Sequence, residues 1–136
     1  MADIAIDSAL VGDARLATNG GTGNRIKFVS SSNGYGFYIN SSNNYVYRKS
    51  TDGGATWGSE VSIATSAAAS PSSHDQWYEK DTPGQTGTKI LISYIDNTND
   101  DIIFRSLDTS SDTLASPVIV DSGQTISSAN ENTPRI

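Results

Sequence analysis

The sequence predicts an all-β fold built from short antiparallel strands, and three observations support this. Isoleucine and valine, with 13 and 6 residues, outnumber the 5 leucines, and serine, threonine and asparagine together supply 44 of the 136 residues, a composition typical of β-structure. Apolar and polar residues alternate in short runs that clusters of Ser, Asn, Asp and Gly separate, as in strands joined by hairpins. No long stretch has a 3.6-residue apolar period, so we expect essentially no helix.

The chain repeats itself with a period of 57 residues. The pentad at residues 4–8 recurs at 61–65 and again at 118–122. The same offset relates further pairs of like residues, namely Phe37 and Tyr94, Asn40 and Asn97, Tyr47 and Phe104, Arg48 and Arg105, Thr56 and Thr113, and Ser59 and Ser116. The repeat therefore defines the organisation of the fold, because each period is one structural unit.

Four strands fit within each period. In the first repeat we expect them at residues 25–29, 35–39, 45–49 and 60–64, with turns at 31–34 and 41–44. In the second repeat we expect them at residues 76–80, 89–95, 102–105 and 117–120. A longer loop at 81–87, which contains a Pro-Gly turn signal, joins the first two strands of that repeat.

A four-stranded antiparallel unit that recurs in this way predicts β-propeller blades. The chain then divides into the outer strand of a preceding blade (1–8), a first blade (9–65), a second blade (66–122) and the start of a third (123–136). Two open blades leave apolar faces and strand edges uncovered. We therefore expect the partners to be further blades of a longer chain, or copies of this chain in a homo-oligomer, where three copies would supply six blades.

The charge balance disfavours several classes of function. The net charge is −6 with a pI near 4.4, and the longest basic run is the pair Arg48 and Lys49, which argues against nucleic-acid binding. The sequence has no stretch near the length of a membrane span, no signal-peptide pattern at its N-terminus and no cysteine for disulfides. An acidic composition rich in Ser, Thr and Asn favours a place outside the cell or on a virion surface.

The segment STDGGATW at residues 50–57 lies between the third and fourth predicted strands of the first repeat. The carboxylate of Asp52 can accept backbone N–H bonds across such a turn, Gly54 permits a positive φ, and Trp57 can bury its ring against the sheet. The segment resembles the Asp box of the sialidase-like bacterial neuraminidase repeat family. The matching positions are Ser50, Asp52, Gly54, Thr56 and Trp57. The second repeat carries a degenerate version with Ser106, Asp108 and Thr113, one extra residue, and Leu114 in place of the tryptophan.

The resemblance implies a propeller, of six blades in most members, with the Asp box on the face opposite the ligand site. The box is therefore no sign of catalysis. The ligand face would be built by the loops at 9–24, 40–44, 66–75, 96–101 and 123–133. Sialidases of this family hold the substrate carboxylate with three arginines. Arg25 and Arg135 begin inner strands, from which a family arginine can reach the ligand, but the Phe/Tyr-Arg-Ile-Pro motif is absent, and Arg48 and Arg105 lie beside the box positions.

Other candidate residues have simpler interpretations. His74 next to Asp75 could belong to a Ser-His-Asp arrangement, but no nucleophile pattern accompanies it, and an exposed loop histidine is favoured. The segment 96–101 starts with Asp96 and resembles a calcium loop only in part, so a polar hairpin turn is favoured. Trp77 is the best candidate for stacking on a sugar. The ligand-face candidates are thus Arg25, His74, Asp75, Trp77, Asp96 and Arg135, and we expect no metal and no cofactor.

These observations lead to a functional expectation. We expect a non-enzymatic structural or glycan-recognition module of the propeller type, as part of a virion surface or another extracellular assembly. A fragment of an exo-sialidase or a related glycoside hydrolase is the first alternative, and a protein-interaction scaffold is the second. The fold alone does not decide among them.

Overall fold

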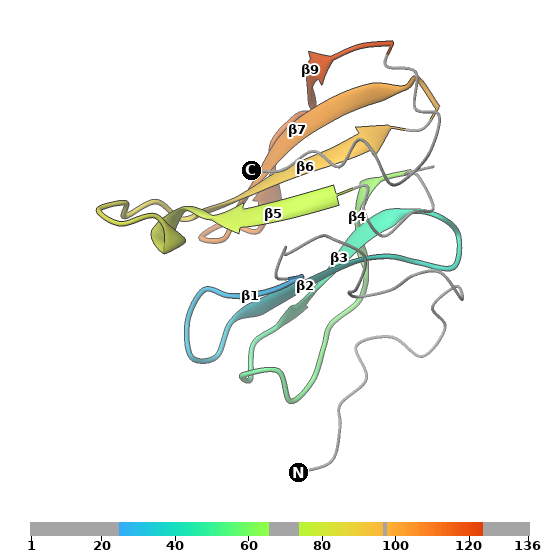
Figure 1. The fold of residues 1–136 in the computed structure, drawn as a ribbon. Coiled ribbons are helices and arrows are strands. Elements are labelled where there is room, and N and C mark those ends of the chain that lie inside the picture. The colour runs from blue at the N-terminus through green and yellow to red at the C-terminus, as the bar shows by residue number, and fades with distance from the viewer. Residues whose placement is uncertain (1–24, 66–73, 97, 124–136) are drawn as a thin grey trace.

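The computed structural model describes residues 25–65, 74–96 and 98–123, which form two antiparallel sheets. Sheet 1 contains β1 (Ile26–Phe28), β2 (Gly34–Ile39), β3 (Tyr45–Ser50) and β4 (Val61–Ala64) in that order. Sheet 2 contains β5 (His74–Tyr78), β6 (Lys89–Asp96), β7 (Asp101–Asp108) and β8 (Thr113–Leu114), and β9 (Val118–Asp121) also pairs with β7. In Figure 1, β5 to β7 lie above β1 to β3, and β9 lies at the top.

The all-β prediction is confirmed, and each of the eight expected strands has a counterpart. Three details differ. β5 starts at His74 and ends at Tyr78, and Glu79–Asp81 forms a short 3-10 helix where we expected the strand to continue. The helix forms because the backbone N–H of Thr82 donates to the carbonyl of Glu79 at 3.0 Å. β7 is longer than expected, and the two-residue strand β8 was not predicted.

The two sheets pack face to face through one shared core. Strand alternation sends Tyr35, Phe37, Tyr45 and Tyr47 to the face of sheet 1 that contacts sheet 2. Across the interface, the ring of Tyr45 lies 5.8 Å from that of Tyr94. The core residues of sheet 2 are Tyr78, Ile90, Ile92, Tyr94, Ile103 and Leu107. Aromatic residues from one repeat and mainly aliphatic residues from the other therefore fill the space between the sheets.

The strand registers correct the repeat alignment at one strand. Tyr38 pairs with Val46 in sheet 1, whereas Tyr94 pairs with Ile103 in sheet 2. Tyr94 is thus the counterpart of Tyr38, not of Phe37 as the offset of 57 suggested. The reason is the connection after the second strand: five residues separate the paired Ile39 and Tyr45, whereas six separate the equivalent pair, Ile95 and Ile102. A slip of one residue moves a side chain to the other face of a sheet. Phe37 therefore points from sheet 1 toward sheet 2, whereas Tyr94 points from sheet 2 toward sheet 1.

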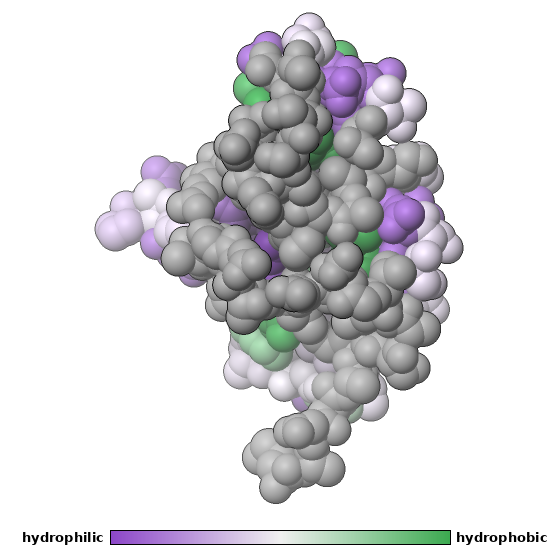
Figure 2. All heavy atoms as spheres, turned by 45° about the vertical axis from the view of Figure 1, so that its right-hand side comes forward, coloured by the Kyte–Doolittle hydropathy of each residue, from purple (hydrophilic) through white to green (hydrophobic). Residues whose placement is uncertain are grey.

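Most large apolar side chains lie between the sheets, but some remain exposed. Among the described residues, the exposed ones are Phe28, Val61, Val118, Ile119 and Val120, and the last three form most of β9. Figure 2 shows hydrophobic atoms among polar ones near the top of the molecule, the end at which β9 lies in Figure 1. The predicted pentad at 4–8 and most of the third segment at 123–136 lie outside the described residues.

Candidate functional site

The antiparallel registers place the turns at two ends of the sheets. The turns at 40–44 and 98–100 follow the second strand of each repeat and lie at one end. The turns at 51–60 and 109–112 follow the third strand and lie at the opposite end. The candidate residues can therefore be sorted by the end to which they belong.

The turn at 50–57 is held together by its own polar side chains. One carboxylate oxygen of Asp52, Oδ1, accepts the backbone N–H of Thr56 at 2.8 Å, and Oδ2 accepts the Thr56 hydroxyl at 2.6 Å. The Ser50 hydroxyl donates to Asp52 at 2.8 Å and accepts the backbone N–H of Gly54 at 2.8 Å. The hydrogen bonds from Thr56, followed by the one from Ser50, lower the pKa of Asp52 to about 2. The expected bonding of Asp52 across the turn is thus present.

Trp57 packs less deeply than expected. It is only half-buried, and Gly54 with its φ of 91° lies between two rings. A Cβ at Gly54 would lie 3.2 Å from Cζ of Phe28 and 3.9 Å from Cζ2 of Trp57. Phe28 is itself 48% exposed. The aromatic rings therefore border the turn near the surface, and Trp57 buries its ring only in part.

The corresponding turn of the second repeat is bonded differently. Oδ1 of Asp108 accepts the backbone N–H of Ser110 at 2.9 Å and its hydroxyl at 2.6 Å, two residues away instead of four. Thr113 lies in β8 and pairs with Asp108, while the carbonyl of Ser106 accepts the N–H of Ala115 at 2.9 Å. The extra residue and the missing glycines thus give a turn closed by strand pairing.

Arg25 and His74 meet at a buried polar cluster between the sheets. Nη1 of Arg25 contacts both ring nitrogens of His74, with Nε2 at 2.8 Å, and donates to the His74 carbonyl at 2.8 Å. Nε2 of Gln76 lies 3.1 Å from Nδ1 of His74, and the ring of Tyr45 stacks on the imidazole at 4.3 Å. His74 is 4% exposed and lies in β5. The prediction of an exposed loop histidine was therefore wrong, because the strand begins two residues earlier than expected.

The electrostatics of this cluster keep His74 neutral. Burial, followed by the nearby charge of Arg25, holds the pKa of His74 well below its ordinary value of 6.5. Burial also lowers the pKa of Arg25, but its guanidinium stays charged, because arginine is not deprotonated in proteins. The hydroxyl of Tyr45 and Oε1 of Gln76 are buried and have no hydrogen-bond partner in the described part of the chain. A neutral imidazole packed against a guanidinium can join two sheets, but it offers no accessible base.

The remaining candidates do not converge on this cluster. Asp75 neighbours His74 on β5, so its side chain points to the opposite face, and its Oδ1 accepts the backbone N–H of Gln76 at 2.9 Å. Oδ1 of Asp96 accepts the backbone N–H of Thr98 at 2.9 Å, as expected for a polar hairpin turn. Arg135 lies outside the described residues.

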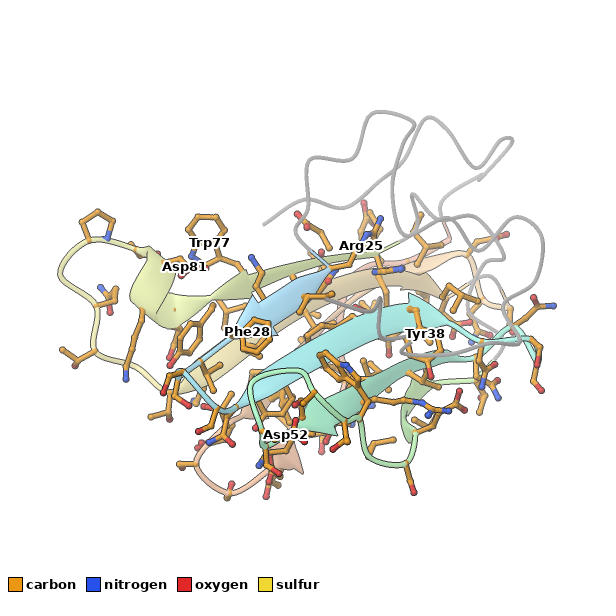
Figure 3. The ribbon with its side chains drawn as sticks, turned by 90° about the horizontal axis from the view of Figure 1, so that it is seen from below. Arg25, Phe28, Tyr38, Asp52, Trp77 and Asp81 are labelled. Carbon is orange, nitrogen blue, oxygen red and sulfur yellow. The ribbon has the colours of Figure 1, made fainter. Side chains whose placement is uncertain are left out.

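Trp77 lies at a different place from Arg25. Figure 3 shows Trp77 next to Asp81 and away from Arg25. Its Nε1 donates to the Thr82 hydroxyl at 2.8 Å, and Nζ of Lys27 lies 5.4 Å from the ring centroid and 3.7 Å from Oδ2 of Asp81. Lys27 from β1 thus joins sheet 1 to the 3-10 helix of the second repeat.

Asp112 makes an inter-sheet contact that sequence reasoning missed. Its Oδ1 accepts the Tyr35 hydroxyl at 2.6 Å, and its Oδ2 lies 2.5 Å from Nζ of Lys49. Asp112 adopts a φ of 55°. Aspartate tolerates this left-handed conformation. The carboxylate thereby reaches from the turn of the second repeat to sheet 1. Its position in a Ser/Asp cluster signalled a turn but not this partner.

Comparisons with family models, with curated proteins and with solved structures found no match. The described residues contain no group of three His, Cys, Asp or Glu side chains that could hold a metal ion. No helix within the described ranges is long and apolar enough to cross a membrane. The fold and the contacts above are therefore the basis for a functional proposal.

Proposed function

We propose that this chain is a non-enzymatic structural module of the β-propeller type, in which the two sheets are successive blades. The observation that carries the proposal is the packing of one repeat on the next through a shared core. Propellers are built from four-stranded antiparallel sheets that recur and pack in this way. The open sheets of the described residues would then be covered by further sheets, most simply those of other copies of this chain.

Glycan recognition is a second form of this proposal, and the described contacts favour it less. A sugar site needs polar and aromatic side chains that a ligand can reach. Arg25 and His74 are instead buried and bonded to each other, and Trp77 is engaged by Thr82 and Lys27. A place on a virion surface or in another extracellular assembly is likewise proposed from composition alone.

The enzymatic alternative, a fragment of an exo-sialidase or related glycoside hydrolase, receives less support. The three described arginines all contact protein groups: Arg25 contacts His74, Arg48 contacts Tyr38 and Glu60, and Arg105 contacts the carbonyls of Ile63 and Ala115. A sialidase-type site would have to draw its groups from other residues. A protein-interaction scaffold is the second alternative, and it differs from our proposal in needing a different protein as its partner.

The mass of the particle in solution separates these proposals. Light scattering of the purified 14.4 kDa chain at several concentrations is expected to give the mass of two or more copies, because uncovered blades associate. A monomer at every concentration would contradict the self-assembling module. Hydrolysis of a fluorogenic sialoside, measured on the same samples, is expected to be absent, and turnover would favour the enzymatic alternative.

A further inference from the structure

Phe28 carries an aromatic ring on the surface of sheet 1. It is the last residue of β1 and is 48% exposed. The preceding residue, Lys27, reaches toward Trp77 and Asp81 of the second repeat. Strand alternation therefore turns Phe28 to the face of sheet 1 that points away from sheet 2, the side from which Figure 3 views the molecule. A ligand can reach the ring from outside.

Two glycines leave room for this ring to lie flat on the sheet. A Cβ at Gly34, the residue paired with Phe28, would lie 2.8 Å from Cε1, 3.0 Å from Cδ1 and 3.1 Å from Cζ of the ring. The three distances are nearly equal, which places the face of the ring, and not its edge, over Gly34. A Cβ at Gly54 would lie 3.2 Å from Cζ, at the tip of the ring. One face of Phe28 thus lies against the backbone and the other points outward.

Trp57 extends this aromatic surface. Its Cζ2 lies 3.9 Å from the Cβ position of Gly54, next to the tip of the Phe28 ring, and the residue is half-buried. The two turns that carry these rings are bonded to each other, because the backbone N–H of Gly53 donates to the carbonyl of Ser32 at 2.8 Å. We call the outward face of Phe28 together with Trp57 the aromatic platform.

The two turns that border the aromatic platform are rich in hydroxyl groups. The segments 28–34 and 50–57 together contain six Ser and Thr residues and one ionisable residue, Asp52. Asp52 is exposed, and its pKa of about 2 keeps the carboxylate ionised at neutral pH. Hydroxyl groups donate and accept hydrogen bonds, and a carboxylate accepts them. An apolar ring face beside such groups matches a sugar ring, which has an apolar face and a rim of hydroxyl groups.

The charges near the aromatic platform disfavour an anionic ligand. Lys27 and Lys49 lie on the other face of sheet 1, over aromatic rings, and Arg48 forms an ion pair with Glu60. A nucleic acid or an acidic sugar would need cations at the site. A second protein is a poor fit as well, because a stable interface buries about 800 Å² on each partner, whereas the aromatic platform offers two rings.

We propose that the aromatic platform binds a neutral oligosaccharide, with one sugar ring stacked on the outward face of Phe28 and its hydroxyl groups bonded to polar side chains of the two turns. The site lies at the end of the sheets that carries the Asp52 turn. This is the end opposite the turns at 40–44 and 98–100, where the resemblance implies the ligand face. The inference goes beyond the proposed structural module and does not depend on self-assembly.

Changes beneath and at the Phe28 ring test the site. The probes are the trisaccharides maltotriose, cellotriose, mannotriose and chitotriose, with binding measured by saturation-transfer NMR titration. At least one should bind the wild type, and Phe28→Ala should weaken its binding about tenfold or more. Gly34→Ala keeps every aromatic ring but adds a Cβ where the Phe28 ring lies, so it should also weaken binding. Ile119→Ala, which removes an exposed apolar side chain from β9, is the matched control and should bind as the wild type does. Thermal unfolding confirms that each variant is folded.

The two tryptophans of the chain locate the bound sugar. In nitrogen-15 NMR spectra, the trisaccharide that binds should shift the indole N–H signal of Trp57 and leave that of Trp77 in place. A shift at Trp77 alone, tighter binding of sialyllactose than of lactose, or equal binding by Phe28→Ala and the wild type would each overturn the proposal. Failure of all the neutral trisaccharides to bind would overturn it as well. Light scattering measures self-assembly separately, so these outcomes leave the structural module standing.

Discussion

At the scale of single residues, two polar side chains carry perturbed acid–base properties for opposite reasons. Asp52 is exposed and its ionised form is stabilised by donors from Thr56 and Ser50. His74 is buried and its ionised form is disfavoured by lost hydration and by Arg25. Both perturbations serve structure: one closes a turn, and the other joins two sheets.

The carboxyl group of Asp52 should titrate near pH 2, where its pKa lies. Its folded-state pKa is depressed, so its contribution to stability is present at neutral pH and is lost as the pH falls through about 2. Carbon-13 NMR of the side-chain carboxyl can measure this. Thr56→Val removes the hydroxyl donor and should raise the midpoint, whereas Thr51→Val, at an exposed neighbour in the same turn, should leave it unchanged. An ordinary midpoint near 3.8 in the wild type would argue against the bonded turn.

The single histidine of the chain should stay neutral well below pH 6.5. Because the folded-state pKa is lowered, the unfolded chain takes up a proton first, and the free energy of unfolding falls as the pH drops below 6.5. In the folded protein the Hε1 resonance of His74 should not shift as the pH falls from 8 through 6.5. The same resonance in urea, which serves as the control, should titrate with its ordinary midpoint. A midpoint near 6.5 in the folded state would mean that His74 is solvated.

At the scale of elements, the two repeats use the same strands with different turns. A one-residue difference in the turn after the second strand changes which side chains face the neighbouring sheet. The 50–57 turn is closed by Asp52, whereas its counterpart is closed by β8 and by Asp108. The strand pairs β3–β4 and β7–β9 nevertheless keep the same register and bulge.

The half-buried Trp57 should contribute less to stability than a core aromatic. We expect Trp57→Ala to lower the free energy of unfolding by about 1–2 kcal/mol, because only part of its ring leaves water on folding. Phe37→Ala, at a residue 1% exposed in the core, should cost about 3–5 kcal/mol through the cavity that it leaves. Urea unfolding of both variants measures the difference. Equal losses would show that Trp57 is covered in solution, for instance by another copy.

At the scale of the whole molecule, polar contacts join the two sheets at both ends of their apolar core. Arg25 and His74 meet at one end, Tyr35 and Asp112 at the other, and Arg105 reaches the carbonyl of Ile63. The partial burial of Asp112 raises its pKa, but the bonds from Lys49 and Tyr35 outweigh this and leave the pKa below its ordinary value. The ionised carboxylate thus stabilises the paired sheets at neutral pH.

A double-mutant cycle measures this inter-sheet contact. Tyr35→Phe and Asp112→Asn should show a coupling of about 0.5–1.5 kcal/mol in the free energy of unfolding, as expected for one typical protein hydrogen bond. Tyr35→Phe with Asp108→Asn is the control, since Asp108 bonds within its own turn and to Thr88, and its coupling should be near zero. If the two cycles give the same value, the sheets are not joined through Asp112.

The sequence by itself determined the local structure of this protein, because that depends on neighbouring residues. Alternation and turn residues located the strands, and the spacing of Ser50, Asp52 and Thr56 determined a self-bonded turn. Tertiary structure alone decided which residues meet across the sheets. Nothing near His74 in the chain shows that Arg25 and Tyr45 enclose it, and nothing near Asp112 points to Tyr35. These contacts join residues 29 to 77 positions apart, and they exist because two sheets with apolar faces must bury them against each other.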